Sequence, residues 1–144
     1  MVAPFTISEA GIEPDELRAC VLDPAAGGFC AFEGWVRNHH EGRAVTGLSY
    51  QSYIALAEKE GARIIAEAME KFPIQKAIGQ HAIGDLDIGG LAIYVAVSAA
   101  HREPAFQACH YIVDEIKARV PIWKKEHYPD SPSQWLACHH CSAG

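Results

Sequence analysis

The sequence lacks the long apolar run, the basic excess and the internal repeats that mark several large protein classes. No apolar stretch approaches the roughly 20 residues of a membrane-spanning helix. Residues 1–8 have neither the basic start nor the apolar centre of a secretory signal. Acidic residues outnumber basic ones by 18 to 12, whereas nucleic-acid partners favour a basic face. We therefore expect a cytoplasmic protein that binds neither nucleic acid nor membrane.

The sequence has five cysteines, an odd number. In a cytosolic protein these thiols are expected to be reduced rather than paired. The length of 144 residues, with 49% hydrophobic and 21% charged residues, is typical of one soluble globular domain. We predict a single domain over residues 1–144.

Strand-like and helix-like patterns alternate along the chain. Strands are predicted at Pro4–Ser8, Phe29–Val36, Val45–Tyr53, Ile74–Ile83, Leu91–Ala99, Ile122–Tyr128 and Gln134–Cys138, and helices at Glu13–Leu22, Ile54–Phe72 and Glu103–Arg119. The second and third strands are expected to pair as a hairpin, and Gly84–Gly90 reads as a turn. The buried stripe of the last helix is expected to include Phe106 and Ile116. The pattern predicts an α+β fold with a mixed, largely antiparallel sheet and two long helices.

The segment Lys117–Glu126 holds four of the twelve basic residues of this acidic protein. A local cation cluster indicates a site for a small anion. Pro121 ends the preceding helix, and the chain can then return Lys124 or Lys125 close to Lys117. Ammonium groups beside apolar walls such as Trp123 can act as proton donors or acceptors. The alternative, which spacing alone favours, is a set of solvated lysines at a helix end.

Two further basic positions are candidates for anion binding. His101 and Arg102 stand between a predicted strand and the start of a helix, whose N-terminus can receive an anion. Arg37 follows a strand and can present its planar fork to a phosphate or carboxylate. The alternatives are that His101 caps the helix while Arg102 is solvated, and that Arg37 is an exposed arginine at a loop edge.

A metal site is a weaker possibility. Cys138 and Cys141 have the C-x-x-C spacing of zinc ligands, but the sequence has no second pair to complete a four-ligand set. No metal site is therefore predicted. A zinc-binding interaction domain built on these two cysteines remains an alternative.

In order along the chain, these pieces resemble the large, catalytic subunits of molybdopterin synthase over about residues 29–135. The motifs that carry the resemblance are Phe32-x-Gly34-x-Val36-Arg37-Asn38, Leu48-x-Tyr50-x-x-Tyr53, His81-x-x-Gly84-x-Leu86-x-x-Gly89, Val95-x-Val97-x-x-Ala100-His101-Arg102-x-x-Ala105-Phe106 and Asp114-x-x-Lys117-x-Arg119-x-Pro121-x-Trp123-Lys124-Lys125-Glu126. The chain departs from the family pattern at Ala82, where the family usually has arginine, and at Gln51, where glutamate is common. Residues 138–144 match no feature of the family.

The resemblance implies an α+β homodimer that binds a small ubiquitin-like sulfur-carrier subunit at each end. The carrier's Gly-Gly tail ends in a thiocarboxylate, which would enter the pocket of the large subunit. Two sulfurs would pass to the pterin substrate, cyclic pyranopterin monophosphate, and form the dithiolene of molybdopterin. The resemblance implies no metal and no cofactor for this step.

The resemblance also implies roles for individual residues. Lys117 would be the catalytic lysine, as base, acid or transient acyl acceptor, and Lys124 would be its partner. The implied substrate-binding residues are Trp35, Val36, Arg37, His101, Arg102, Lys125 and Glu126. His101 and Arg102 would come from the neighbouring subunit. A non-catalytic α+β module that binds a partner's anionic C-terminal tail is the alternative function.

Overall fold

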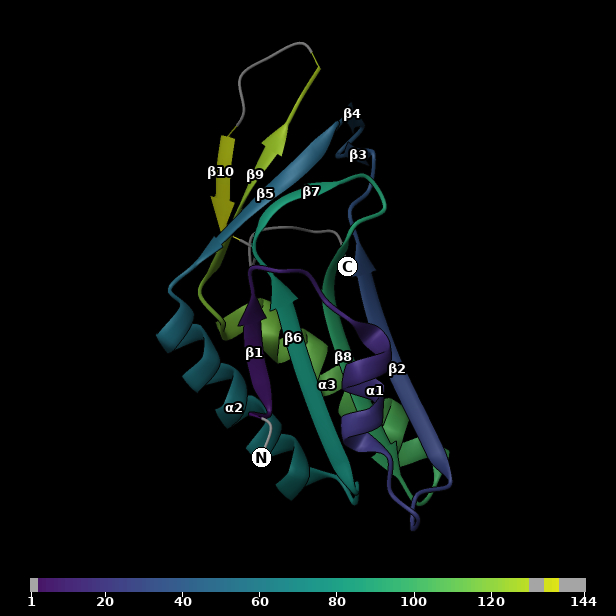
Figure 1. Cartoon of the computed structure of the whole chain (residues 1–144). Coiled ribbons are helices and arrows are strands. Elements are labelled where there is room, and N and C mark those ends of the chain that lie inside the picture. Colours follow the sequence, from purple (N-terminus) through teal and green to yellow (C-terminus); the bar gives the residue numbers. More distant parts are fainter. Residues whose placement is uncertain (1–2, 130–133, 138–144) are drawn as a thin grey trace.

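The chain forms three helices and ten strands within the part that the computed structural model describes, residues 3–129 and 134–137 (Figure 1). In chain order these are β1 (Phe5–Ser8), α1 (Pro14–Val21), β2 (Gly28–Trp35), β3 (His39–His40), β4 (Arg43–Ala44), β5 (Gly47–Ser52), α2 (Ile54–Lys71), β6 (Lys76–Ala82), β7 (Gly84–Asp87), β8 (Leu91–Ala99), α3 (Arg102–Arg119), β9 (Ile122–His127) and β10 (Gln134–Ala137).

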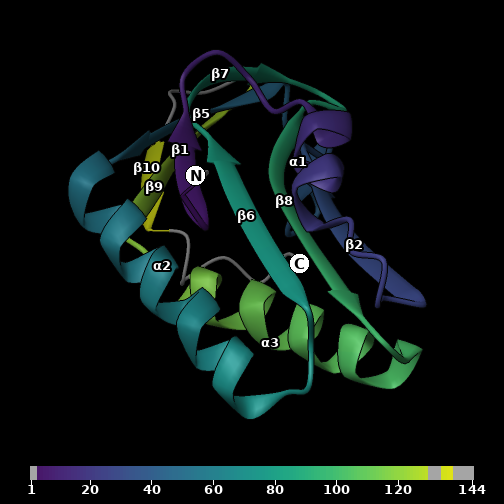
Figure 2. The ribbon, with the colours of Figure 1, turned by 60° about the horizontal axis from the view of Figure 1, so that its bottom comes forward.

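The longer strands divide into two four-stranded sheets. The first sheet has the order β1-β6-β8-β2 and the second has the order β10-β9-β5-β7. The pair β1–β6 is parallel, and the other strand pairs of both sheets are antiparallel. Helices α2 and α3 lie side by side on one face of the first sheet, with α1 on its other face (Figure 2). The α+β fold with two long helices is confirmed.

The predicted hairpin between the second and third strands is wrong. β2 pairs with β8, and β5 pairs with β7 and β9. The reason is burial: residues 92–99 of β8 are all buried, so β8 needs strands on both edges and helices on both faces. β5 instead alternates buried Leu48 and Tyr50 with less buried Ser49 and Gln51, as in a sheet with one covered face. The connection between β2 and β5 forms its own small hairpin, β3–β4.

The segment Gly84–Gly90 is a turn only in its second half. Residues Gly84–Asp87 form strand β7, which pairs with β5. The chain then reverses where the Gly90 amide donates to the Asp87 carbonyl oxygen at 2.9 Å and Gly89 adopts a φ of 81°. That φ favours glycine, because a side chain is strained there.

Small residues set how closely the long helices approach the first sheet. Gly61 of α2 faces the ring of Phe5 in β1, and a Cβ at this position would lie 2.2 Å from that ring. The inner face of α3 carries Ala105, Ala108, Cys109, Ile112, Val113 and Ile116. Phe106 was expected on this face but is 51% exposed. It lies one position past Ala105, about 100° around the helix, and points away from the sheet.

Candidate active site

A pocket opens between the two sheets, beside the C-terminal end of α3. Its volume, counted out to the open mouth, is about 790 Å³. Its wall is lined by residues of both sheets and α3: Gly34, Trp35, Arg37, His39, His40, Val45, Leu48, Tyr50, His81, Ala92, Ile93, Ile116, Lys117, Val120, Ile122, Lys124 and Glu126. The aliphatic residues give the pocket an apolar body around a few charged groups.

Lys117 projects into this pocket from the last turn of α3. Its side chain is half-buried, and its Nζ lies over the ring of Phe32 at 5.7 Å from the centroid. A cation at this place is stabilised by the negative end of the helix dipole and by the face of the aromatic ring. Lys117 directly follows Ile116, which the sequence placed on the buried stripe and which is buried here.

Lys124 and Glu126 enter the same pocket from β9. Alternation along the strand turns Ile122, Lys124 and Glu126 inward. Lys124 is 7% exposed and Glu126 is 2% exposed, which is rare for charged side chains. The Tyr128 hydroxyl donates to Glu126 Oε1 at 2.9 Å. Burial, together with this hydrogen bond, raises the pKa of Tyr128.

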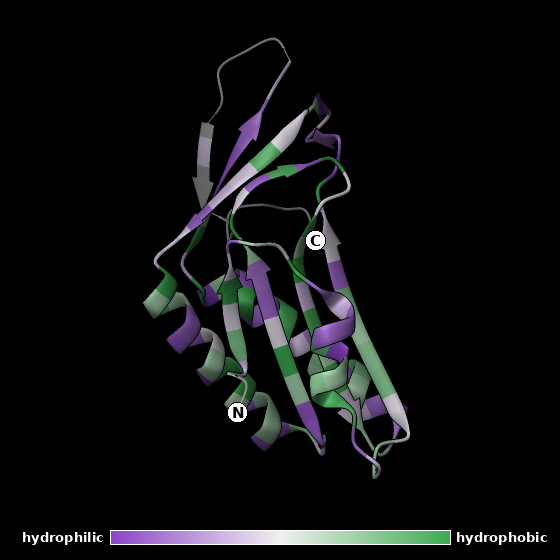
Figure 3. Ribbon diagram, viewed as in Figure 1, coloured by the Kyte–Doolittle hydropathy of each residue, from purple (hydrophilic) through white to green (hydrophobic). Residues whose placement is uncertain are grey.

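Lys125 points the other way. Its Nζ lies over the Trp135 ring at 5.4 Å, on the opposite face of β9 from the pocket. Figure 3 shows most of β9 as hydrophilic, so hydropathy alone does not separate its two faces. The structure therefore brings Lys117, Lys124 and Glu126 together and leaves Lys125 outside the pocket.

His81 is a buried pocket residue to which the sequence analysis assigned no role. Its Nδ1 lies 2.7 Å from the Ala82 carbonyl oxygen, and its ring packs edge-on against Tyr50 at 4.8 Å. Burial lowers its pKa to about 4, and the charge of Lys117 contributes to that shift. A carbonyl oxygen only accepts hydrogen bonds, so the neutral ring donates from Nδ1 and carries its lone pair on Nε2. The pocket thus contains an uncharged acceptor near its lysine.

The segment after β2 lines the mouth of the pocket. Trp35, 65% exposed, and Arg37 both border the opening. Val36 lies between them with its side chain in the core. Its amide donates to the Gly90 carbonyl oxygen at 3.0 Å, and its own carbonyl accepts from Gly89 at 2.8 Å. These bonds hold the mouth segment against the turn after β7.

His101 and Arg102 lie far from this pocket within one chain. They are exposed at the N-terminal end of α3, whereas Lys117 is in its last turn. The 15 residues between Arg102 and Lys117 correspond to about 22 Å along the helix axis. One chain therefore does not place the two groups in a single site.

The described residues 3–129 and 134–137 contain no group of three or more His, Cys, Asp or Glu side chains that could hold a metal ion. Cys138 and Cys141, the candidate zinc ligands, lie outside these residues. Over the same part of the chain, no helix is long and apolar enough to cross a membrane.

Two lysines from separate elements of this α+β fold share one apolar pocket. The chain therefore belongs to the class of proteins whose pocket suits a small anionic ligand. The family model described as MoaE protein matches residues 7–119, and the chain belongs to this family.

Similar proteins cover nearly the whole chain. The molybdopterin synthase catalytic subunit of Pyrococcus abyssi is 47% identical over 122 residues, which are 85% of this chain and 82% of that one. A crystal structure of molybdopterin synthase from Staphylococcus aureus matches with a TM-score of 0.88 and 36% identity, over 94% of this chain and 98% of that chain. A complex of subunits 1 and 2 of molybdopterin-converting factor from Helicobacter pylori shares the fold, with a TM-score of 0.71 and 23% identity over 90% and 92% of the two chains.

Proposed function

We propose that this chain is the catalytic subunit of a molybdopterin synthase. It takes sulfur from the thiocarboxylated tail of a small carrier protein and transfers it to cyclic pyranopterin monophosphate, forming the molybdopterin dithiolene. The observation that carries the proposal is the convergence of Lys117 and Lys124 on one apolar pocket. The thiocarboxylate and the substrate phosphate are both anions, which these ammonium groups can stabilise where water is largely excluded. The 47% identity to a molybdopterin synthase catalytic subunit supports this assignment.

Lys117 is assigned as the catalytic group and Lys124 as its partner. Each sulfur transfer places negative charge on the carbonyl of the carrier tail, and an ammonium group at hydrogen-bond distance stabilises that charge. Glu126, on the same face of β9, helps to orient Lys124 and limits the positive charge of the pocket. Among these residues only the mouth group Arg37, with Trp35 and the Val36 backbone beside it, is open enough to meet the substrate phosphate first.

The complete site is proposed to need two copies of the chain. His101 and Arg102 are exposed about 22 Å along α3 from Lys117, so a second copy has to supply them. β2 is the edge strand of the first sheet and pairs only with β8 within the described residues, which leaves an edge for another chain. A carrier protein on each pocket then gives a heterotetramer.

The reaction is assigned to the cytoplasm. Cys20, Cys30 and Cys109 are free thiols, as expected in a reducing compartment. No metal or cofactor is needed for the proposed transfer, because the sulfur arrives already activated on the carrier.

Reconstitution tests the function and the lysine together. Purified chain is mixed with thiocarboxylated carrier and cyclic pyranopterin monophosphate, and molybdopterin is measured for wild type, Lys117→Ala and Lys59→Ala. We expect Lys117→Ala to lower the rate about 100-fold or more, because it removes the ammonium charge that stabilises the transition state. Lys59, exposed on α2, is the matched control and should leave the rate unchanged.

Either of two results would contradict this proposal. A folded wild type that binds the carrier and forms no product would support the non-catalytic binding module instead. A fully active Lys117→Ala variant would support the proposed function but show that Lys117 is not the catalytic group.

A further inference from the structure

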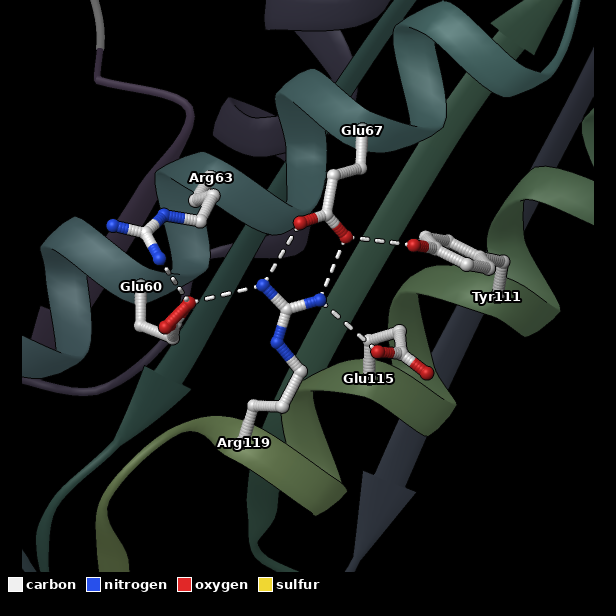
Figure 4. Close-up of polar contacts among 6 residues, drawn as sticks. All are labelled: Glu60, Arg63, Glu67, Tyr111, Glu115 and Arg119. Carbon is white, nitrogen blue, oxygen red and sulfur yellow. Dashed lines mark hydrogen bonds and ion pairs between the residues drawn. The ribbon is translucent and has the colours of Figure 1, made fainter.

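Arg119, the last residue of α3, is held by three carboxylates and joins the end of this helix to α2 (Figure 4). Its Nη1 donates to Glu67 at 2.6 Å and to Glu115 at 3.0 Å. Its Nη2 donates to Glu67 at 2.9 Å and to Glu60 at 3.0 Å. The Tyr111 hydroxyl adds a hydrogen bond to Glu67 at 2.7 Å. We call these five residues the Arg119 clamp.

The clamp fixes the orientation of the last turn of α3. The two-pronged contact between the guanidinium and Glu67 restricts both the position and the plane of the Arg119 fork. Hydrogen bonds from Arg119, then from Tyr111, lower the pKa of Glu67 to about 2. The charged side chains are 21–32% exposed, and ion pairs open to water contribute little stability each. The network that gathers three carboxylates around one arginine also fixes the geometry of the helix end.

That geometry bears directly on Lys117. Residues two apart on an α-helix point about 200° apart, so Arg119 facing α2 turns Lys117 to the opposite side, into the pocket. Both residues lie in the last turn, where helices fray because their final carbonyls lack helical partners. The clamp holds this turn at its last residue.

The segment that leads from the clamp to Lys124 is held by hydrogen bonds of its own. Directly after Arg119, the Val120 amide donates to the Ile116 carbonyl oxygen at 3.0 Å. The Pro121 carbonyl then accepts from Ser52 Oγ at 2.8 Å, and β9 begins at the next residue. The last turn of α3 is thus fixed on one side to α2 and on the other to β5, so the two lysines keep a set separation.

We propose that Arg119 is a positioning residue for Lys117 and acts through the rotation of this last turn. The proposal rests on the function proposed above, in which Lys117 is catalytic. A lysine Nζ lies roughly 8 Å from its helix axis, so a rotation of about 10° displaces it by roughly 1.5 Å. Misplacement by about 1 Å costs on the order of 100-fold in rate. Arg119 itself does not line the pocket.

The test combines Arg119→Gln with Lys117→Ala at a temperature where all variants remain folded by circular dichroism. Arg119→Gln should lower the rate at saturating carrier and substrate about 30- to 100-fold, with carrier affinity and substrate KM within about twofold of wild type. Added to Lys117→Ala, it should cause no further loss, because its effect passes through Lys117. Arg119→Lys should recover part of the rate, since it keeps the charge without the fork.

Arg63→Gln is the matched control. Arg63 reaches the same Glu60 at 3.7 Å but is 61% exposed and contacts no other carboxylate of the clamp in Figure 4. It should keep the wild-type rate. If Arg119→Gln does not fold, Glu67→Gln replaces it, because it weakens the clamp and leaves Arg119 two carboxylates.

Three results would overturn the positioning role. A full rate in Arg119→Gln while Lys117→Ala is inactive would reject the clamp and leave the proposed function intact. An equal loss in the presence and absence of Lys117 would show that Arg119 serves general stability. A fully active Lys117→Ala would remove the residue through which the clamp is proposed to act.

Discussion

At the scale of the residue, burial of an imidazole in the pocket links protein stability to pH. His81 has its pKa lowered from 6.5 to about 4, mainly by burial, with the Lys117 charge adding to it. The unfolded chain binds this proton below pH 6.5, whereas the folded chain resists it until about pH 4. The free energy of unfolding is therefore highest above pH 6.5, where the ring is neutral in both states. It decreases as the pH falls from 6.5 to 4.

We expect His81→Gln to flatten the pH dependence of stability in this window. Between pH 7 and pH 4 the free energy of unfolding of wild type should fall by roughly 3 kcal/mol more than that of the variant. Denaturant unfolding at half-unit pH intervals measures the difference. Glu67, whose pKa is lowered to about 2, serves as internal control. Its contribution to the free energy of unfolding is lost only below pH 4.5, and that loss should be the same in wild type and in the variant. Parallel curves between pH 7 and pH 4 would contradict a neutral buried His81.

Lys124 and Lys125 are neighbours in the sequence but have different surroundings, and the sequence predicted only part of this difference. The extended segment after Pro121 was predicted, and alternation in any strand places Lys124 and Lys125 on opposite faces. Which face meets the pocket depends on β5, whose Tyr50 pairs with Lys124 some seventy positions later in the chain. Spacing along the chain contains no information on that choice. His81 was missed as a pocket residue for the same reason, since its partners Tyr50 and Lys117 come from other elements.

At the scale of the element, the two long helices were the most predictable part of the fold. The helix expected at Ile54–Phe72 is observed at Ile54–Lys71, and the strand Leu91–Ala99 has the predicted bounds. Both depend on local periodicity, which the sequence carries directly. The hairpin expected between β2 and β5 failed because strand pairing is a long-range choice. β8, the true partner of β2, begins 56 residues after β2 ends at Trp35.

The contact between α2 and β1 gives a prediction for packing. Gly61→Ala should destabilise the protein by about 1–3 kcal/mol through overpacking against Phe5, although alanine favours helices by ~1 kcal/mol. Thermal and urea unfolding measure the change.

The second variant, Phe5→Leu, checks the cause. Combined with Gly61→Ala, it should recover part of the loss, because it removes the ring atoms that the new Cβ meets. A purely additive pair of changes would show that the helix and strand do not interact at this point.

At the scale of the whole molecule, the proposed two-chain site predicts complementation between inactive variants. In a mixed dimer of Lys117→Ala and Arg102→Ala, one pocket receives both changes and the other receives neither. Equal mixing and random reassembly should therefore restore about a quarter of wild-type molybdopterin formation. Each variant alone should remain nearly inactive. Mixing without subunit exchange is the control, and no recovery after verified exchange would place Arg102 outside the partner's site.

The order of the strands along the chain sets the order in which the protein can acquire its parts during synthesis. The first sheet is complete once Ala99 has left the ribosome. In the second sheet β5 can pair with β7 by then, but it gains its other neighbour, β9, only when Ile122–His127 emerges. Strand pairs between segments far apart in the chain form late in folding. A nascent chain thus has the first sheet with α1 and α2 before it has α3 and β9, and a product truncated before β9 would lack the pocket residues Lys124 and Glu126.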